Sequence, residues 1–162
     1  MNLIVAVDEN WGIGHDNELL VHIPEDMKMF RKKTINNVVI MGRKTLESFP
    51  NKKPLKDRLN IILTTDVSYK VEGAVVLHSI DDLLNEIKQY NQEDIFVIGG
   101  ASIYNQLLTY CNTAYITKIK NKYVADTYFP DLEKNNDWEM VEESDVFEYN
   151  RILYTFTKWR KK

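Results

Sequence analysis

Short apolar runs alternate with helical patterns along most of this chain. The runs typical of strands are LIVAV, NVVIM, LNIIL, AVVL, DIFVI and AYITKI, and several are apolar enough to be covered on both faces. The segments typical of helices are PEDMKMFRKK, KTLESF, SIDDLLNEIKQY and ASIYNQLL. Ser79 is a good cap for the third of these, with Asp82 three residues later as in a capping box. This alternation predicts an α/β domain with a mixed, mostly parallel sheet of about eight strands, flanked by about four helices.

The C-terminal part of the chain follows a different pattern. Residues 137–144 and 151–159 alternate between polar and apolar side chains, with DVFEYN between them. That alternation predicts an antiparallel strand pair added at one edge of the sheet. A short linker, YFPDLEKNND, precedes the pair, and there is no sign of a second domain. We therefore expect residues 1–162 to form one domain.

One carboxylate stands out at the start of the first helical pattern. If a helix begins at Pro24, then Ile23, Met27 and Phe30 share one face, and Asp26 lies on or beside this apolar stripe. An acid in the first turn is stabilised by the helix dipole and can simply be solvated. Alternatively, it points into a pocket and binds a ligand rich in N–H donors. The pattern alone leaves both interpretations open.

Composition narrows the classes of function. The net charge of −3 gives no global basic footprint for nucleic acid. The single cysteine, Cys111, rules out an internal disulfide and suits a reducing compartment, and we expect it to be a small, partly buried side chain. The N-terminus lacks the pattern of a signal peptide, and no stretch approaches a membrane span. We therefore expect a soluble cytoplasmic protein without a membrane partner.

Glycines follow two of the predicted strands. Gly99 and Gly100 separate the strand DIFVI from the helix ASIYNQLL, and Gly42 stands between NVVIM and KTLESF. Glycine lets the backbone approach a ligand closely, and the free N–H groups at a helix start favour an anion. Each glycine is also compatible with ordinary turn chemistry.

Cations and hydroxyls accompany these glycines. Arg43, Lys44 and Thr45 follow Gly42, and Thr64 and Thr65 end the strand LNIIL. In open α/β sheets, ligands lie beyond the carboxyl ends of the strands. Three such ends with phosphate-binding residues indicate a dinucleotide. The patterns G-x-G-x-x-G and G-x-x-x-x-G-K-[ST] are absent, which argues against a phosphate-loop NTPase.

A long loop, DENWGIGHDNELL, follows the first predicted strand, with Gly12 and Gly14 at its middle. Loops of this length in a small domain are usually functional, and a lid over a pocket is our hypothesis. His15 and His22 flank it, but no further His or Cys stands at a useful spacing. We therefore expect no metal site.

Six motifs together resemble the dihydrofolate reductase family. LIVAVDENWGIGHDNELLVHIPEDMKMF, VIMGRKTLESF, PLKDRLNIILTT, VIGGASIYNQLL, YITKI and ADTYFPD occur in the order and spacing of that family, from residue 2 to about 131, and the closing strand pair is consistent with it. The acid after Ile23-Pro24 is Asp, which resembles the bacterial form.

The resemblance implies an NADPH-dependent reductase. It would convert 7,8-dihydrofolate to tetrahydrofolate, supply one-carbon metabolism and thymidylate synthesis, bind antifolate inhibitors and act as a monomer. One alternative on the same fold is the NADPH-dependent pyrimidine reductase of riboflavin synthesis, which would not need Arg58 together with Asp26. Another is a non-catalytic nucleotide-binding module, which would have no use for Asp26 and Thr117 in one place.

The resemblance also assigns the substrate site. Asp26 would bind the pterin's amino group and ring N–H as the catalytic acid, assisted by Thr117, and Arg58 would hold the carboxylate of the glutamate tail. The implied substrate-binding residues are Ile4, Val5, Asp26, Met27, Phe30, Phe49, Leu55, Arg58, Ile98 and Thr117.

The cofactor site is implied in the same way. Arg43 and Thr65 would meet the 2′-phosphate, Tyr104 would lie near the nicotinamide, and Asp126 would steady the lid. The implied cofactor-binding residues are Ala6, Ile13, Gly14, Asn17, Glu18, Gly42, Arg43, Lys44, Thr45, Thr64, Thr65, His78, Gly99, Gly100, Ala101, Ser102, Ile103, Tyr104 and Gln106.

Two positions depart from the family pattern. Leu20 and Val21 stand where the family usually has Pro-Trp, whose Trp helps to hold water at the pterin and packs the lid. Ser102 stands where many bacterial members have Arg after the glycines. The grip on the 2′-phosphate then depends on Arg43, with His78 nearby, and we expect a weaker preference for NADPH.

Overall fold

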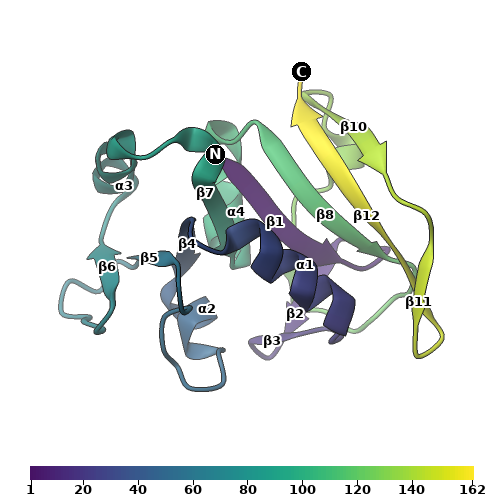
Figure 1. The fold of residues 1–162 in the computed structure, drawn as a ribbon, viewed down its shortest axis with the longest axis horizontal. Coiled ribbons are helices and arrows are strands. Elements are labelled where there is room, and N and C mark those ends of the chain that lie inside the picture. Colours follow the sequence, from purple (N-terminus) through teal and green to yellow (C-terminus); the bar gives the residue numbers. More distant parts are fainter.

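Parallel strands form the centre of the main sheet (Figure 1). The computed structural model describes residues 1–162. The sheet runs in the order β10-β12-β8-β1-β7-β4-β5-β6, with β11 paired to β12. The strands are β1 (Asn2–Val7), β4 (Val38–Gly42), β5 (Leu59–Leu63), β6 (Ala74–Leu77), β7 (Ile95–Gly99), β8 (Thr113–Ile119), β10 (Trp138–Glu143), β11 (Phe147–Tyr149) and β12 (Ile152–Lys161). The predicted fold class is confirmed.

Alternate residues of the central strands pack on opposite faces of the sheet. Leu3, Ile40 and Val97 belong to a large core cluster on one face, whereas Ile4 and Phe96 belong to a smaller cluster on the other. Both faces are covered, which explains why these strands are continuous apolar runs in the sequence.

Four helices cover the sheet, as predicted. They are α1 (Pro24–Thr34), α2 (Arg43–Glu47), α3 (Ile80–Glu86) and α4 (Ala101–Leu107), with short 3₁₀ turns at Ile87–Gln89, Gln92–Asp94, Leu108–Tyr110 and Leu132–Lys134. In the view of Figure 1, α1 lies in front of β1 and α4 lies behind the sheet. Each face of the sheet therefore has its own helical cover. No helix of this chain combines the length and the apolar character that crossing a membrane requires.

The apolar stripe predicted for α1 is only partly correct. Ile23, the residue before the helix, is buried, and Phe30 is half-buried, but Met27 is 37% exposed. Pro24 opens the first turn as expected, where its missing N–H removes no hydrogen bond. The stripe fails at Met27 because the first turns of α1 border an open site rather than the core.

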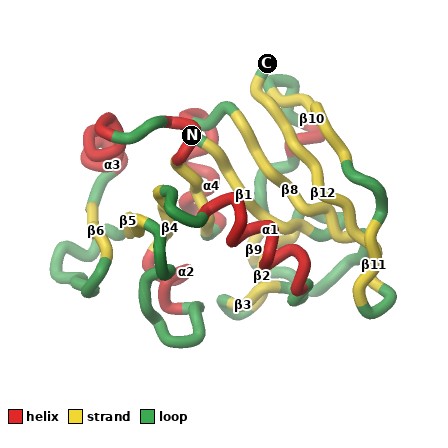
Figure 2. The backbone as a smooth tube through the Cα atoms, viewed as in Figure 1, coloured by secondary structure: helices red, strands yellow, loops and turns green.

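The C-terminal strands run antiparallel at one edge, as predicted. β12 pairs with both β8 and β10. The segment between them was not predicted as a strand, yet β11 forms a hairpin with the start of β12. Asn150 and Arg151 turn this hairpin with positive φ angles of 48° and 65°, a conformation that Asn tolerates well. Figure 2 shows this hairpin as a projection beyond the main sheet.

Two predicted irregular segments turn out to be ordered differently. The long loop at residues 8–20 contains β2 (Gly12–His15) and β3 (Glu18–Leu19), which form a second small sheet with β9 (Thr127–Tyr128) (Figure 2). The predicted linker is part of the core, since Phe129 and Leu132 are almost fully buried. The sequence did not predict the two short strands of the loop or the burial of the linker, because the partners of these residues are distant in the sequence.

The start of α3 provides a stability test. The Ser79 side chain accepts a hydrogen bond from the backbone N–H of Asp82, as the sequence predicted. Replacing this cap by Ala leaves that N–H without its partner, so Ser79→Ala should lower the free energy of unfolding by about 1 kcal/mol, and Ser79→Gly by only a few tenths. Urea unfolding of the three proteins checks this. Equal losses for Ala and Gly would contradict the capping role.

Candidate active site

Asp26 and Thr117 meet between α1 and the centre of the sheet. Asp26 is in the first turn of α1 and half-buried, and Thr117 is fully buried on β8. The Thr117 hydroxyl donates a hydrogen bond of 2.6 Å to Asp26 Oδ1. The predicted contact is confirmed. Asp26 is therefore not an acid solvated at a helix start, and its second oxygen, Oδ2, accepts no hydrogen bond within the chain.

Burial controls the ionisation of Asp26. Desolvation raises the pKa of the carboxyl above its usual value, whereas the hydrogen bond from Thr117 and the nearby charge of His22 lower it. Desolvation dominates, so the pKa is raised. This acid keeps its proton to higher pH than an exposed Asp and can donate or share it nearer neutrality.

Apolar residues form a wall beside this acid. Phe30, Phe49, Leu55 and Ile98 are half-buried and pack against the cluster that contains Ile4. They come from α1, β7, β1 and the segment after α2, so only the fold brings them together. A flat, largely apolar ring system suits such a wall.

One residue assigned to this wall packs elsewhere, and a second is exposed. The Val5 side chain packs against the large cluster on the opposite face of the sheet, because neighbouring residues of a strand point to opposite sides. Met27 is exposed on α1. The assignment of the Val5 side chain to the substrate wall is therefore wrong.

Arg58 lies at the outer end of this region. Its Nη1 donates to Thr34 Oγ1 at 3.1 Å, and its Nε donates to the carbonyl of Lys56 at 3.0 Å. Burial lowers its pKa, and Arg31 adds to the effect. No carboxylate of the chain forms a salt bridge with the guanidinium. Only the nearby charge of Asp57 opposes these effects, so the guanidinium is free to bind an anion from outside.

The turns after β4 and β7 touch each other. Gly99 has a φ of +134°, and a Cβ added there would lie 3.4 Å from Thr45 Oγ1. A Cβ added at Gly42 would lie 3.1 Å from Ile103 Cγ1. The bare backbone is needed at both turns, so the two glycine motifs of the sequence form one region at the strand ends.

Arg43, next to these turns, is already paired. Its Nε donates to Glu47 at 2.8 Å and its Nη1 to Asp66 at 3.0 Å. Its guanidinium also lies 4.3 Å from the centre of the Tyr69 ring. The hydrogen bond from Arg43 to Glu47 is the largest of the influences that raise its pKa. The guanidinium is thus held flat between two acids and a ring.

Tyr104 joins the same region to β1. It is buried, and its hydroxyl donates to the carbonyl of Ile4 at 2.7 Å. Burial strongly raises the pKa of this phenol, so it stays protonated. The bond fixes α4 against the strand that carries the substrate wall.

The segment at residues 8–20, for which a lid is our hypothesis, is tied to two other parts of the chain. The Asp126 N–H donates to the carbonyl of Gly14 at 3.0 Å, and the Asp16 N–H donates to Asp126 Oδ2 at 2.9 Å. The Asn17 side chain donates to the carbonyl of Lys44 on α2 at 3.0 Å. The predicted contact with Asp126 is confirmed, and the lid reaches the strand-end region as well.

The other implied cofactor residues surround this region with varied exposure. His78 Nδ1 lies 2.9 Å from the carbonyl of Thr64, and Gln106 donates to Ser102 Oγ at 2.9 Å. Glu18, Thr65, Ser102 and Gln106 are exposed, Ala6, Ile13, Thr64, His78, Gly100 and Ala101 are half-buried, and Ile103 is buried. Their roles stay predictions.

Comparisons with known proteins identify the family. The family model for dihydrofolate reductase matches residues 1–161. A dihydrofolate reductase of Bacillus subtilis is 37% identical, covering 100% of this chain and 95% of that protein, and one of Buchnera aphidicola is 42% identical, covering 87% and 85%. A solved dihydrofolate reductase of Enterococcus faecalis, complexed with NADP(H) and RAB-propyl, superposes with a TM-score of 0.87 at 32% identity, covering 99% of this chain and 95% of that one.

The chain belongs to the dihydrofolate reductase family. The predicted family is therefore confirmed, and the open choice between three functions is decided for the first. The nicotinamide cofactor that the sequence implied is consistent with the NADP(H) in the Enterococcus complex.

One organising residue of this reductase was missed in the sequence. Asp8 is buried, and its carboxylate accepts backbone hydrogen bonds from Asn10, Gly12 and Tyr123 at 2.8–3.0 Å. It therefore ties the root of the lid to the loop that carries Asp126. The only signal in the sequence is an acid directly after a strand, which is common in loops.

The first departure from the family pattern is accommodated by neighbouring residues. Val21 and Tyr123 both pack against the small cluster of Ile23, Ile119 and Tyr154. The Tyr123 hydroxyl is buried and has no hydrogen-bond partner within the chain. Val21 therefore has apolar neighbours at this place, but its side chain, unlike that of Trp, brings no N–H donor to the reductase site.

The lid also brings three potential metal ligands together. Ligand atoms of His15, Asp16 and Asp126 lie within 4.8 Å of one another, and all three residues are exposed. The sequence indicated no third ligand because Asp126 is distant along the chain. Asp126 already accepts a hydrogen bond from the lid.

The raised pKa of Asp26 predicts a pH-dependent stability. The folded state disfavours the charged form, so ionisation costs stability above the raised pKa and costs nothing below both pKa values. Asp26→Asn should therefore be more stable than the wild type at pH 8, and the gain should shrink as the pH falls through the raised pKa. Urea unfolding from pH 8 down to pH 3, which is below the ordinary pKa of an Asp, measures this, with Glu25→Gln, an exposed acid of the same turn, as the control. A gain that does not vary with pH would refute the explanation.

Proposed function

We propose that this chain reduces 7,8-dihydrofolate to 5,6,7,8-tetrahydrofolate with NADPH, and that Asp26 orients the substrate. Membership of the dihydrofolate reductase family supports the reaction. The observation that carries the assignment of Asp26 is its hydrogen bond with the fully buried Thr117. The product would supply one-carbon metabolism and thymidylate synthesis.

Asp26 would act through its two oxygens. Thr117 donates to Oδ1 and so fixes the plane of the carboxyl group, which leaves Oδ2 and the remaining lone pair of Oδ1 for the ligand. The amino group and the adjacent ring N–H of a pterin present two donors in one plane. A carboxylate that accepts both would hold the ring in a single orientation against the apolar wall.

The same acid would help to move the proton. Reduction of the imine needs a proton on its nitrogen, and because burial raises the pKa of Asp26, this acid keeps its proton to higher pH than an exposed Asp does. We assign to Asp26 the promotion of this protonation, through water at the mouth of the site. Thr117 would serve as a positioning residue, because it bonds the acid and fixes its orientation.

The strand-end region fits a dinucleotide. Gly42 and Gly99 keep the backbone free of side chains where two parallel strands end, and Thr45 lies beside Gly99. We assign the pyrophosphate to residues 99–104 with Lys44 and Thr45. When bound, NADPH supplies the hydride. The lid, which already reaches Lys44 through Asn17, would exclude water from the nicotinamide half.

The 2′-phosphate would have to share Arg43 with acids. The guanidinium has five N–H donors, and its Nε and Nη1 already donate to Glu47 and Asp66. A phosphate arriving there gains the cation but meets the negative charge of Asp66. Because Ser102 stands in place of a second arginine, binding of the 2′-phosphate depends on Arg43. We also propose a cytoplasmic monomer that binds dihydrofolate and antifolate inhibitors.

The role of Asp26 is tested by Asp26→Asn. The amide cannot supply a proton and presents one donor to the pterin, so kcat/KM for dihydrofolate should fall by about a hundredfold or more. The loss of NADPH absorbance with purified protein measures turnover, and fluorescence titration measures NADPH binding, which should be unchanged. Glu25→Gln serves as the matched control. Near-normal turnover in Asp26→Asn would refute the role, whereas an inactive wild type that still binds NADPH would refute the reaction.

The variant Asp66→Asn tests whether Asp66 and the 2′-phosphate of NADPH compete for Arg43. Removing the acid should raise the ratio of kcat/KM for NADPH over NADH by about two- to fivefold, the usual range for an exposed ion pair. Arg43→Ala should lower the same ratio, because only NADPH carries the 2′-phosphate. Glu72→Gln, an exposed acid of the same connection between β5 and β6, should leave it unchanged. If Asp66→Asn changed both cofactors equally, the competition would be excluded.

A further inference from the structure

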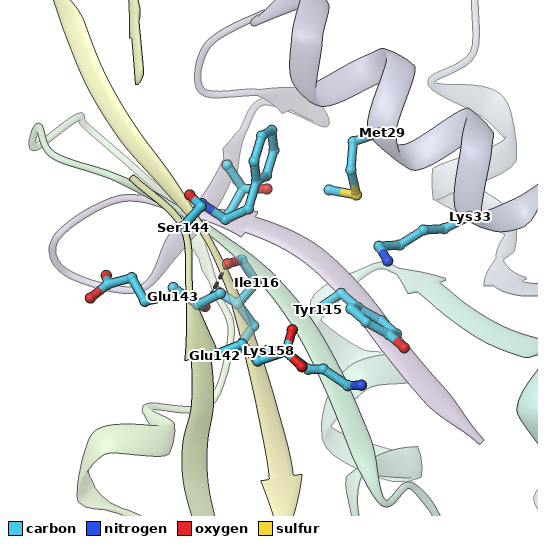
Figure 3. A pocket seen from close by; sticks show the side chains of 11 residues that line it. Met29, Lys33, Tyr115, Ile116, Glu142, Glu143, Ser144 and Lys158 are labelled. Carbon is cyan, nitrogen blue, oxygen red and sulfur yellow. Dashed lines mark hydrogen bonds between the residues drawn. The ribbon is translucent and has the colours of Figure 1, made fainter. Parts of the chain in front are cut away.

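A cavity lies against α1 (Figure 3). It has a volume of about 510 Å³, within the range of small-molecule sites. Met29 and Lys33 reach it from α1, Tyr115 forms part of its floor, and Lys158 approaches from β12 (Figure 3). Of the implied substrate-binding residues, only Thr117 lines it. The cavity therefore shares Thr117 with the acid site but none of the residues of the apolar wall.

Two lysines of this cavity face the same aromatic ring. Lys33 Nζ lies 4.1 Å from the centre of the Tyr115 ring, and Lys158 Nζ lies 5.7 Å from it. Neither lysine forms a salt bridge, although Glu142 lines the same cavity. Burial and then the charge of Lys158 lower the pKa of Lys33, whereas the charge of Glu142 raises it. Two cations lie over one ring without a salt bridge to an acid, and such a place favours an anion.

The remaining walls limit the kind of anion. Met29, Phe156 and the Tyr115 ring are apolar or aromatic, so the ligand needs an apolar body. The hydroxyl of Thr157 already donates to the carbonyl of Ile116, and that of Ser144 to the carbonyl of Asp145. Because these hydroxyls already donate within the chain, the lysines are the main free hydrogen-bond donors of the cavity.

The acids of the cavity limit the negative charge that the ligand can carry. Glu142 and Glu143 also line the cavity, and their carboxylates would repel a doubly charged phosphate. A single carboxylate on a flat ring has both the apolar body and the single negative charge that the cavity requires. We propose that this cavity binds a small aromatic carboxylate, with its charge between Lys33 and Lys158 and its ring against Met29 and Phe156.

The ligand would also lie next to the acid site. Met29 and Lys33 come three and seven residues after Asp26, which places all three on one side of α1. Thr117, which holds Asp26, lines the cavity. The backbone signals of residues 115–117 should therefore respond to binding.

Titration of ¹⁵N-labelled protein with 2-naphthoate tests the proposal. Saturating folate and NADP⁺ keep the reductase site filled, so that the probe can bind only outside it. We expect saturable shifts at residues 29, 33, 115–117 and 158, with a dissociation constant on the order of 1 mM for a ligand of this size. The neutral analogue 2-naphthamide should bind at least tenfold more weakly.

Matched variants locate the charge. Lys33→Met and Lys158→Met should each weaken 2-naphthoate at least tenfold, and Lys33→Arg, which keeps the charge, should retain binding. Lys32→Met is the control, because Lys32 is exposed and does not line the cavity. The proposal is overturned if no saturable shifts occur, if 2-naphthamide binds equally well, if inorganic phosphate gives the same shifts with the same affinity, or if Lys32→Met matches Lys33→Met.

Discussion

The hydrogen bond from Thr117 to Asp26 joins the first helix to the middle of the sheet, and the arrangement of the site depends on it. Thr117 is fully buried on β8, so its hydroxyl has no water to bond and needs an acceptor. Asp26 supplies that acceptor and is thereby held half-buried, which raises its pKa. One contact thus fixes the place of α1 and the ionisation of the acid.

Because α1 lies across the sheet, it divides the surface there into two parts. One side holds the apolar wall of Phe30, Phe49 and Leu55 beside Asp26. The cavity of Lys33, Tyr115 and Lys158 lies apart from that wall. Asp26 and Thr117 lie at the border of the two regions, and two lysines without a salt bridge line the second. The separation follows from the periodicity of the helix and the strands, which directs neighbouring side chains to different sides.

The strand ends and the lid follow a second constraint, the pairing of buried polar groups. Asp8 is buried and collects three backbone N–H groups from two loops, so it holds the lid and the Asp126 loop in one structure. The lid in turn bonds α2 through Asn17. A segment that follows a strand in the sequence is therefore ordered by residues more than a hundred positions away.

The sequence by itself determined the elements and their chemistry. Continuous apolar runs identified the strands because both faces of the sheet are covered, and Ser79 marked the start of α3 because a helix leaves its first N–H groups free. The family motifs located Asp26, Thr117 and the glycines, since each of these roles demands one residue type. Only the tertiary structure decided that Val5 points away from the substrate wall, that the lid is part of a small sheet, and that Asp66 shares Arg43. These features, like the cavity beside α1, depend on residues far apart in the chain, and periodicity reports only on near neighbours.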